Sequence, residues 1–265
     1  MTEAVALEDL VAMPPGSGLA AALGAVDLSR VPSTELVDVL RMQSRQCAHE
    51  QARLWAALVE VGLAVPPDEL PDGASAPTRA AEVAAWASSE VAAALTWTSR
   101  TADRELDLAQ VVVRALPQVF AALWAGNIDR GKAVVFAGYL DPTCGVTAEQ
   151  AAVICARLLP VAPGLTTAQL RGRLWRAVLA IDPDWARRRY TRAVRGRAVT
   201  AVLADDGTVA LTGSGLPADE AAVACARVDR LAEAAKRAGH PGRLGQIAAD
   251  VYLGLLDGRF HGLSE

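Results

Sequence analysis

The sequence has few of the side chains on which most active sites depend. Its 265 residues include three histidines, His49, His240 and His261, and a single asparagine, Asn127. The histidines fall in separate predicted elements, and their spacing matches no metal-binding signature. We therefore predict no metal site, no cofactor and no catalytic residues. Two carboxylates brought together by folding would leave no local signature, so an enzyme with an unrecognised site stays open as an alternative.

Cysteine is also scarce, and Cys47, Cys144, Cys155 and Cys225 lie far apart in the sequence. No two of them form the C-x-x-C pair of zinc sites and redox motifs. This spacing favours reduced, core-type thiols over a disulfide framework. The N-terminus, MTEAVALEDL, is acidic where a secretion signal would be basic. No uninterrupted apolar run approaches the roughly 18 residues of a membrane span. We expect a cytoplasmic protein with no membrane partner.

Aromatic residues make up only 5% of the chain, whereas hydrophobic residues make up 52%, much of it alanine. Alanine is the best helix former, and small side chains allow close helix packing. Apolar residues recur at helical spacing over most of the chain. The period changes only near residues 198–213, where Asp205-Asp206-Gly207 joins two β-rich runs. The predicted fold is mainly α, a multi-helix domain with one small β-hairpin insert.

The helical pattern also predicts individual elements. Helices are expected at residues 33–62, 79–116, 117–126, 129–140, 147–159, 166–181, 183–196, 218–238 and 244–256. Four prolines in VPPDELPDGASAPT predict a loop or linker at residues 65–78. We thus expect an N-terminal helical segment at 1–64, a helical core with the hairpin at 79–258 and a tail at 259–265. A surface loop within one domain is an equal alternative for residues 65–78.

Positive charge is concentrated in one segment of an acidic chain. Nine arginines lie between Arg171 and Arg197, against two acidic residues, Asp182 and Asp184, a balance of +7. Because the formal net charge is -4, the rest of the chain carries -11. A basic segment in an acidic body predicts a local surface that faces an anion.

The arginines are densest in DPDWARRRYTRAVRGRAVT, residues 182–200. On a helix, Arg188, Arg192 and Arg195 share one face. Arginine pairs with phosphate through a planar fork of donors, as nucleic-acid backbone contacts require. The predicted nucleic-acid-binding residues are Arg187, Arg188, Arg189, Arg192, Arg195 and Arg197.

Two questions about this segment stay open at the level of sequence. Trp185 and Tyr190 are placed either to stack on a base or to anchor the helix in the core. The arginines could instead pair with acidic residues of the same chain, such as Glu220, Asp229 and Glu233. A further motif, GSGLPA at residues 213–218, fits a dinucleotide-binding pattern but lacks the strand–helix–strand setting. We interpret it as a turn into a helix that starts at Pro217.

Three stretches together resemble a known family: LPQVFAALWAGNIDRGKA; LTTAQLRGRLWRAVLAIDPDWARRRYTRAVRGRAVTAVLADDGTVALTGSGLPADEAA; and GRLGQIAADVYLGLLDG. The chain is similar, from about Leu36 to Gly258, to the domain of unknown function 222, or 13E12 repeat family, of high-GC bacteria. That domain commonly precedes an HNH nuclease module, so the resemblance implies nucleic-acid processing. An HNH site needs a histidine base, metal ligands and an asparagine, and the three histidines and one asparagine cannot supply it.

We therefore expect a non-catalytic module that binds DNA or RNA through the arginine-rich helix. The resemblance implies an HNH nuclease module in the parent protein as a partner. The alternative is a helical protein-interaction or homo-oligomerisation domain without nucleic-acid contact.

Overall fold

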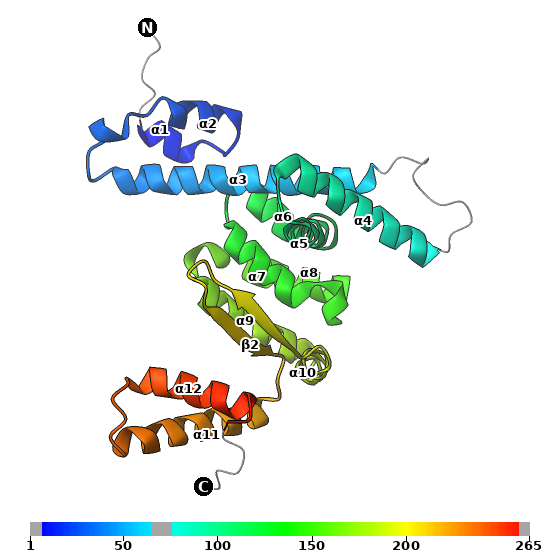
Figure 1. The fold of residues 1–265 in the computed structure, drawn as a ribbon. Helices are drawn as coiled ribbons and strands as arrows, with labels where there is room; N and C mark the ends of the chain where they lie inside the picture. Colours follow the sequence, from blue (N-terminus) through cyan, green and yellow to red (C-terminus); the bar gives the residue numbers. More distant parts are fainter. Residues whose placement is uncertain (1–6, 65–75, 260–265) are drawn as a thin grey trace. The chain divides into compact units, whose positions relative to one another are not determined.

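A computed structural model describes residues 7–64 and 76–259 of the chain. It consists of helices and one two-stranded antiparallel hairpin (Figure 1). This confirms the predicted fold class, mainly α with a small hairpin. The chain divides into two compact units, residues 1–185 and 186–265. The division between residues 185 and 186 lies inside the segment 79–258, which was expected to form one helical core. The domain boundaries expected on either side of the proline-rich loop at 65–78 stay predictions.

The first unit contains nine of the described α-helices. They are α1 (Leu7–Ala12), α2 (Ser17–Gly24), α3 (Leu36–Leu63), α4 (Ala76–Leu95), α5 (Ser99–Gln110), α6 (Pro117–Trp124), α7 (Arg130–Leu140), α8 (Ala148–Leu158) and α9 (Thr167–Ile181). Short 3-10 turns lie at Leu28–Arg30, Pro142–Cys144 and Ala162–Gly164, and a π-helical turn lies at Val111–Ala115. Residues 65–75, most of the predicted loop, and the end of the predicted tail lie outside the described residues.

Local sequence explains several helix starts. Thr147 and Thr166 cap α8 and α9, each in a capping box with a glutamine three residues later. Asp129 caps α7 by accepting a hydrogen bond from a backbone N–H in its first turn. Pro117 occupies the first turn of α6, where its missing N–H has no cost. These starts agree with the sequence prediction to within one residue.

One predicted helix is interrupted. Residues 79–116 were expected to form a continuous helix, but the chain turns between α4 and α5. Thr96 adopts a positive φ of 55°, and the Thr98 side chain caps α5 by accepting from the backbone N–H of Thr101. Neither glycine nor proline marks this turn, and the apolar spacing continues across it, so periodicity gave the wrong result.

The long helix α3 is central to the first unit and packs against α1, α2, α4, α5 and α6 (Figure 1). Its N-cap is Glu35, which makes no side-chain capping bond, so the helix begins three residues later than the start expected at residue 33. Trp55 of α3 is fully buried and its Nε1 donates to Glu105 of α5 at 3.2 Å. Glu105 also pairs with Arg130 of α7, so one carboxylate joins three helices.

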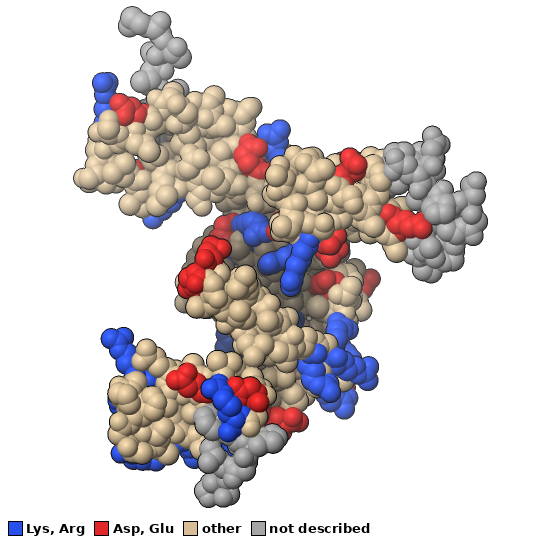
Figure 2. Space-filling view, viewed as in Figure 1, with Lys and Arg blue, Asp and Glu red and all other residues tan. Residues whose placement is uncertain are grey.

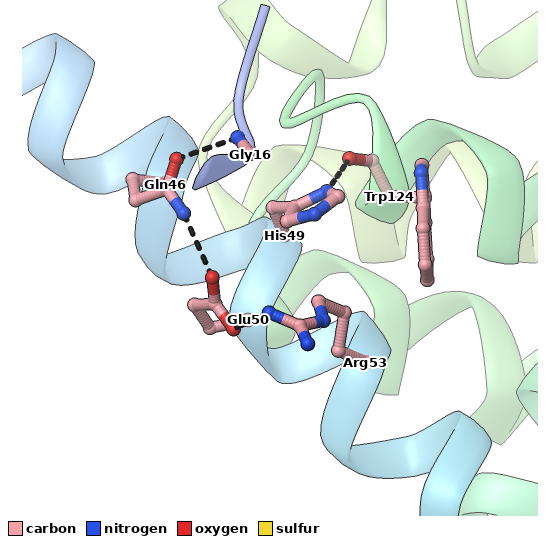
Figure 3. A network of polar contacts seen from close by, with 6 residues as sticks. All are labelled: Gly16, Gln46, His49, Glu50, Arg53 and Trp124. Atoms are coloured by element: carbon pink, nitrogen blue, oxygen red, sulfur yellow. Dashed lines mark hydrogen bonds and ion pairs between the residues drawn. The ribbon is translucent and has the colours of Figure 1, made fainter. Parts of the chain in front are cut away.

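Polar side chains of α3 hold the neighbouring segments in place (Figure 3). Buried Gln46 accepts from the backbone N–H of Gly16 and donates to Glu50, both at 2.8 Å. His49, also buried, lies 2.7 Å from the carbonyl oxygen of Trp124 through its Nδ1. Because a carbonyl oxygen can only accept, Nδ1 is the donor. These groups satisfy one another, which indicates a structural role.

The second unit is smaller. It contains all but the first residue of α10 (Trp185–Arg195), followed by β1 (Ala198–Leu203), β2 (Val209–Ser214), α11 (Ala218–Arg237) and α12 (Leu244–Leu256). Strands β1 and β2 pair from Ala198 opposite Ser214 to Leu203 opposite Val209. Its buried apolar cluster consists of Ala232, Ile247 and Val251, where α11 packs on α12.

All four cysteines are free thiols. Cys155 is buried as predicted, but Cys47 and Cys225 are exposed, so the prediction of core-type thiols was wrong for them. Within residues 7–64 and 76–259, no single helix combines the length and apolar character needed to cross a membrane. Helix α5 with its π turn meets those criteria only in combination with α6, across a bend of 102°.

Candidate nucleic-acid interface

The arginine-rich helix α10 begins at a buried aromatic residue. Trp185 is fully buried in the first unit, with its ring stacked on Tyr139 of α7 at 5.8 Å between centroids. Trp175 of α9 meets the same ring edge-on at 5.3 Å. Of the two roles that the sequence left open, Trp185 therefore has the structural one. Tyr190, on the same helix, is 49% exposed.

Four arginines of α10 surround one hollow on the protein surface. Its volume is about 470 Å³, and its lining consists of Arg187, Arg188, Thr191, Arg192 and Arg195. All five side chains come from one helix, at the spacing that brings successive turns to a common face. Figure 2 shows the basic surface gathered over α10. No acidic residue is among the described residues that line this hollow.

The other two predicted arginines lie at the margins. Arg189 is half-buried and does not line the hollow. Arg197 follows the end of α10, and its Nη1 donates to the carbonyl oxygen of Val194 at 2.9 Å, which helps to close the helix C-terminus. Thr191 was not predicted, although its i,i+4 spacing from Arg187 and Arg195 places it between them. Its hydroxyl donates to the carbonyl oxygen of Arg187 at 3.0 Å.

The arginines of α10 differ in how far the chain itself engages them. Interactions within the protein involve Arg187, Arg188, Arg189 and Arg192. Within the described part of the chain, the Arg195 side chain makes neither a hydrogen bond nor an ion pair, and it is exposed. Of the acidic residues considered as internal partners, Glu233 pairs at 3.8 Å with Arg237 of its own helix. Substitution of Arg195 therefore tests ligand binding with the least effect on folding.

The chain that follows the hairpin packs directly on α10. Gly215 has a φ of +67°, and a Cβ at this position would lie 2.5 Å from the carbonyl oxygen of Ala193. Glycine alone avoids both the backbone strain and the overlap. This close approach places the base of the hairpin at the C-terminal end of the arginine-rich helix. The sequence showed a glycine-rich turn here but not what the turn contacts.

The hairpin turn is closed by a carboxylate. Asp206 accepts from the backbone N–H and the hydroxyl of Thr208, at 2.9 and 2.7 Å. These hydrogen bonds lower the pKa of Asp206, because they favour its charged form. Gly207 follows at a φ of 80°, as the predicted Asp-Gly turn requires. The turn therefore forms at the predicted position.

The other candidate motifs form no recognisable site. Residues 7–64 and 76–259 contain no group of three or more histidine, cysteine or acidic side chains placed to hold a metal. His240 accepts from the backbone N–H of Gly242 at 3.2 Å, and His261 lies outside the described residues. GSGLPA leads from an antiparallel strand into α11, as interpreted, but Pro217 is the N-cap and not the first helical residue.

Comparison with known proteins identifies one family. Residues 23–248 match the family described as "Domain of unknown function (DUF222)". The matched region includes α10, the hairpin and the core helices α3 to α9. No curated protein and no solved structure matches the chain. Because the match extends over most of the sequence, the chain belongs to the DUF222 family.

Proposed function

We propose that this chain is a non-catalytic module that binds nucleic acid through α10. The observation that supports the proposal is the hollow of about 470 Å³ on α10, with four arginines and no carboxylate among its described lining residues. Guanidinium groups pair with phosphate oxygens through two parallel hydrogen bonds, and these charge-assisted bonds are among the stronger ones in proteins. Such a surface suits an anionic backbone better than an uncharged ligand.

The spacing along α10 also suits a phosphate backbone. Arg188 and Arg195 are seven residues apart, which at about 1.5 Å per residue separates their Cα atoms by roughly 10 Å along the helix axis. Phosphates of one DNA strand rise by about 3.4 Å per nucleotide, so this length spans about three steps and faces about four phosphates. Tyr190 is about half exposed, but at about 100° per residue it lies on the opposite side of α10 from Arg188 and Arg192, so we assign it no contact with the bound strand.

The module's role in a larger protein follows from the resemblance alone. A DUF222 domain beside an HNH nuclease would hold that nuclease on its substrate. Phosphate contacts fix the position and orientation of a protein on nucleic acid but carry little sequence information. We accordingly propose that α10 supplies affinity with little base specificity, and that cleavage chemistry belongs to the partner module.

The test is a fluorescence-anisotropy titration of labelled duplex and single-stranded DNA at several salt concentrations. Each phosphate neutralised on duplex DNA contributes about -0.9 to the slope of log K against log salt. Four arginine contacts therefore predict a slope of roughly -3.6. Arg195→Gln should make the slope less steep by about 0.9. Arg227→Gln on α11 is the matched control, since it removes one exposed positive charge from the same unit.

A quadruple variant with Arg187, Arg188, Arg192 and Arg195 replaced by glutamine should lose most of the binding. Thermal melting of the same variant shows whether those arginines matter for folding instead. A large drop in melting temperature, together with no salt-dependent binding by the wild type, would favour internal pairing. Absence of wild-type binding to both duplex and single strands at low salt would refute the proposal.

The hairpin supports the alternative function of self-association. Val199, Val202 and Leu203 of β1 are 70%, 62% and 72% exposed. A two-stranded hairpin with exposed apolar side chains is marginal by itself and has open edges for pairing. Gel filtration of the wild type distinguishes the two functions. A dimer that dissociates on Val202→Lys without loss of DNA affinity would favour the interaction domain.

A further inference from the structure

The first unit contains a second arginine-lined pocket, distinct from the hollow on α10. Its volume is about 550 Å³, and it lies between α8 and α9. Its lining residues are Arg157, Leu158, Val161, Arg173, Arg176, Ala177 and Ala180. Three arginines therefore line one pocket together with apolar residues. None of the arginines of α10 lines it.

The pocket follows from the packing of two helices. The pocket-lining residues of α9 are spaced three, one and three residues apart, so they occupy one face of the helix. They are Arg173, Arg176, Ala177 and Ala180. Arg157 comes from the last turn of α8, which packs against α9. Capping boxes at the start of both helices fix where they begin. The pocket is thus built on two regular helices.

No acidic residue is among the described residues that line this pocket. Residues 150–181 include four arginines and no aspartate or glutamate. Within the described residues, the side chains of Arg157 and Arg173 make no hydrogen bond or ion pair, and that of Arg176 donates to the carbonyl oxygen of Gly172 at 3.2 Å. Like charges gathered in one place repel, and an anion bound among them would replace repulsion with attraction.

We propose that this pocket binds a small phosphate ester that carries several negative charges and an apolar portion, the chemical class of the nucleotides. Three guanidiniums match a di- or triphosphate better than a single carboxylate. Leu158, Val161 and the two alanines offer an apolar wall for a base or sugar. The volume lies within the range of about 300–1,000 Å³ typical of small-molecule sites. The proposal does not rest on nucleic-acid binding by α10.

Isothermal titration calorimetry of the full chain with ATP and with pyrophosphate, at low salt, tests the proposal. We expect ATP to bind more tightly than pyrophosphate, because only ATP can use the apolar wall. Arg173→Gln should weaken ATP binding at least tenfold, equivalent to about 1.4 kcal/mol. Arg171→Gln is the matched control: the residue is exposed on the same helix, carries the same charge and does not line the pocket.

Several results would overturn the proposal. They are an equal loss of affinity in the Arg171 and Arg173 variants, no ATP binding by the folded wild type, or equal affinities for ATP and pyrophosphate. Ala180→Phe fills part of the pocket without a charge change, so it should weaken ATP but leave pyrophosphate unaffected.

The quadruple glutamine variant of α10 separates the two proposed functions. We expect it to keep its affinity for ATP even where DNA binding is lost. Loss of ATP binding in that variant would place the ligand on α10 and refute the separate pocket. In the same variant, displacement of ATP from the pocket by a short oligonucleotide would refute its assignment to a small ligand.

Discussion

Replacement of Trp185 by alanine should destabilise the first unit and loosen the start of α10. Trp185 is fully buried between Tyr139 and Trp175. A tryptophan buries roughly 200 Å², which at about 25 cal/mol per Å² corresponds to about 5 kcal/mol. Measured Trp→Ala costs are about 3–5 kcal/mol, and we expect a loss of unfolding free energy in that range. Domains are typically stable by only about 5–15 kcal/mol, so such a loss would be readily measured.

Urea denaturation followed by far-ultraviolet circular dichroism measures this loss. Trp175→Ala is the matched control, because Trp175 belongs to the same cluster but is 40% exposed. Its truncation should cost about 1–3 kcal/mol, in proportion to the smaller area buried. Trp185→Phe retains a ring for Tyr139 and should cost less than the alanine variant. Equal losses for the two Trp→Ala variants would refute the anchoring role of Trp185.

The same variant has a consequence for binding. Arg187 and Arg188 lie in the first turn of α10, two and three residues after Trp185. If the first turn frays, these two arginines lose their fixed positions, whereas Arg195 at the other end keeps its place. The salt slope for duplex DNA should then become less steep by up to about 1.8, the equivalent of two phosphates. An unchanged slope in folded Trp185→Ala would show that the first turn makes no phosphate contact.

Three further predictions concern other parts of the chain. Gly215→Ala should destabilise the second unit by about 1–2 kcal/mol in urea titrations, because the positive φ is strained and the new Cβ overlaps the carbonyl oxygen of Ala193. Burial raises the pKa of Cys155 to about 12, so a maleimide should label exposed Cys225 and leave Cys155 unmodified until the protein unfolds, as mass spectrometry would show. The pKa of Asp206 is lower in the folded hairpin than in the unfolded chain, so its carboxylate stabilises the folded hairpin. This stabilisation is complete above the unfolded pKa of about 3.9 and is lost as the pH falls through the lower folded pKa. A titration by nuclear magnetic resonance should find that folded pKa below the ordinary one.

Helices could be predicted where apolar periodicity and a terminal signal coincide. At the N-terminus of α9, the repeat of leucine and valine begins next to a capping box formed by Thr166 and Gln169. Both signals are local in the sequence. The break after α4 has no such signal, since Thr96 takes a positive φ without a neighbouring glycine or proline. The π turn at Val111–Ala115 was also missed, because one additional residue in a turn barely changes the apolar spacing.

The candidate site was predictable to the extent that it depends on one helix. The spacing placed Arg188, Arg192 and Arg195 on a common face, and all three line the hollow of α10. The role of Trp185 was not predictable, because its burial depends on aromatic rings of two other helices. The pocket in the first unit was missed for the same reason. Arg157 is sixteen residues before Arg173, and only the packing of α8 on α9 brings them to one pocket.

The nine arginines from Arg171 to Arg197 are divided between the two units. Those of α9 belong to the first unit, and those after Trp185 belong to the second. The hollow on α10 is lined by one helix and suits an extended backbone, whereas the α8–α9 pocket has an apolar wall and suits a small ligand. Added salt weakens exposed charge contacts strongly, but it does not weaken apolar contacts. Rising salt should therefore reduce DNA affinity more steeply than ATP affinity, and equal slopes for the two ligands would contradict this division.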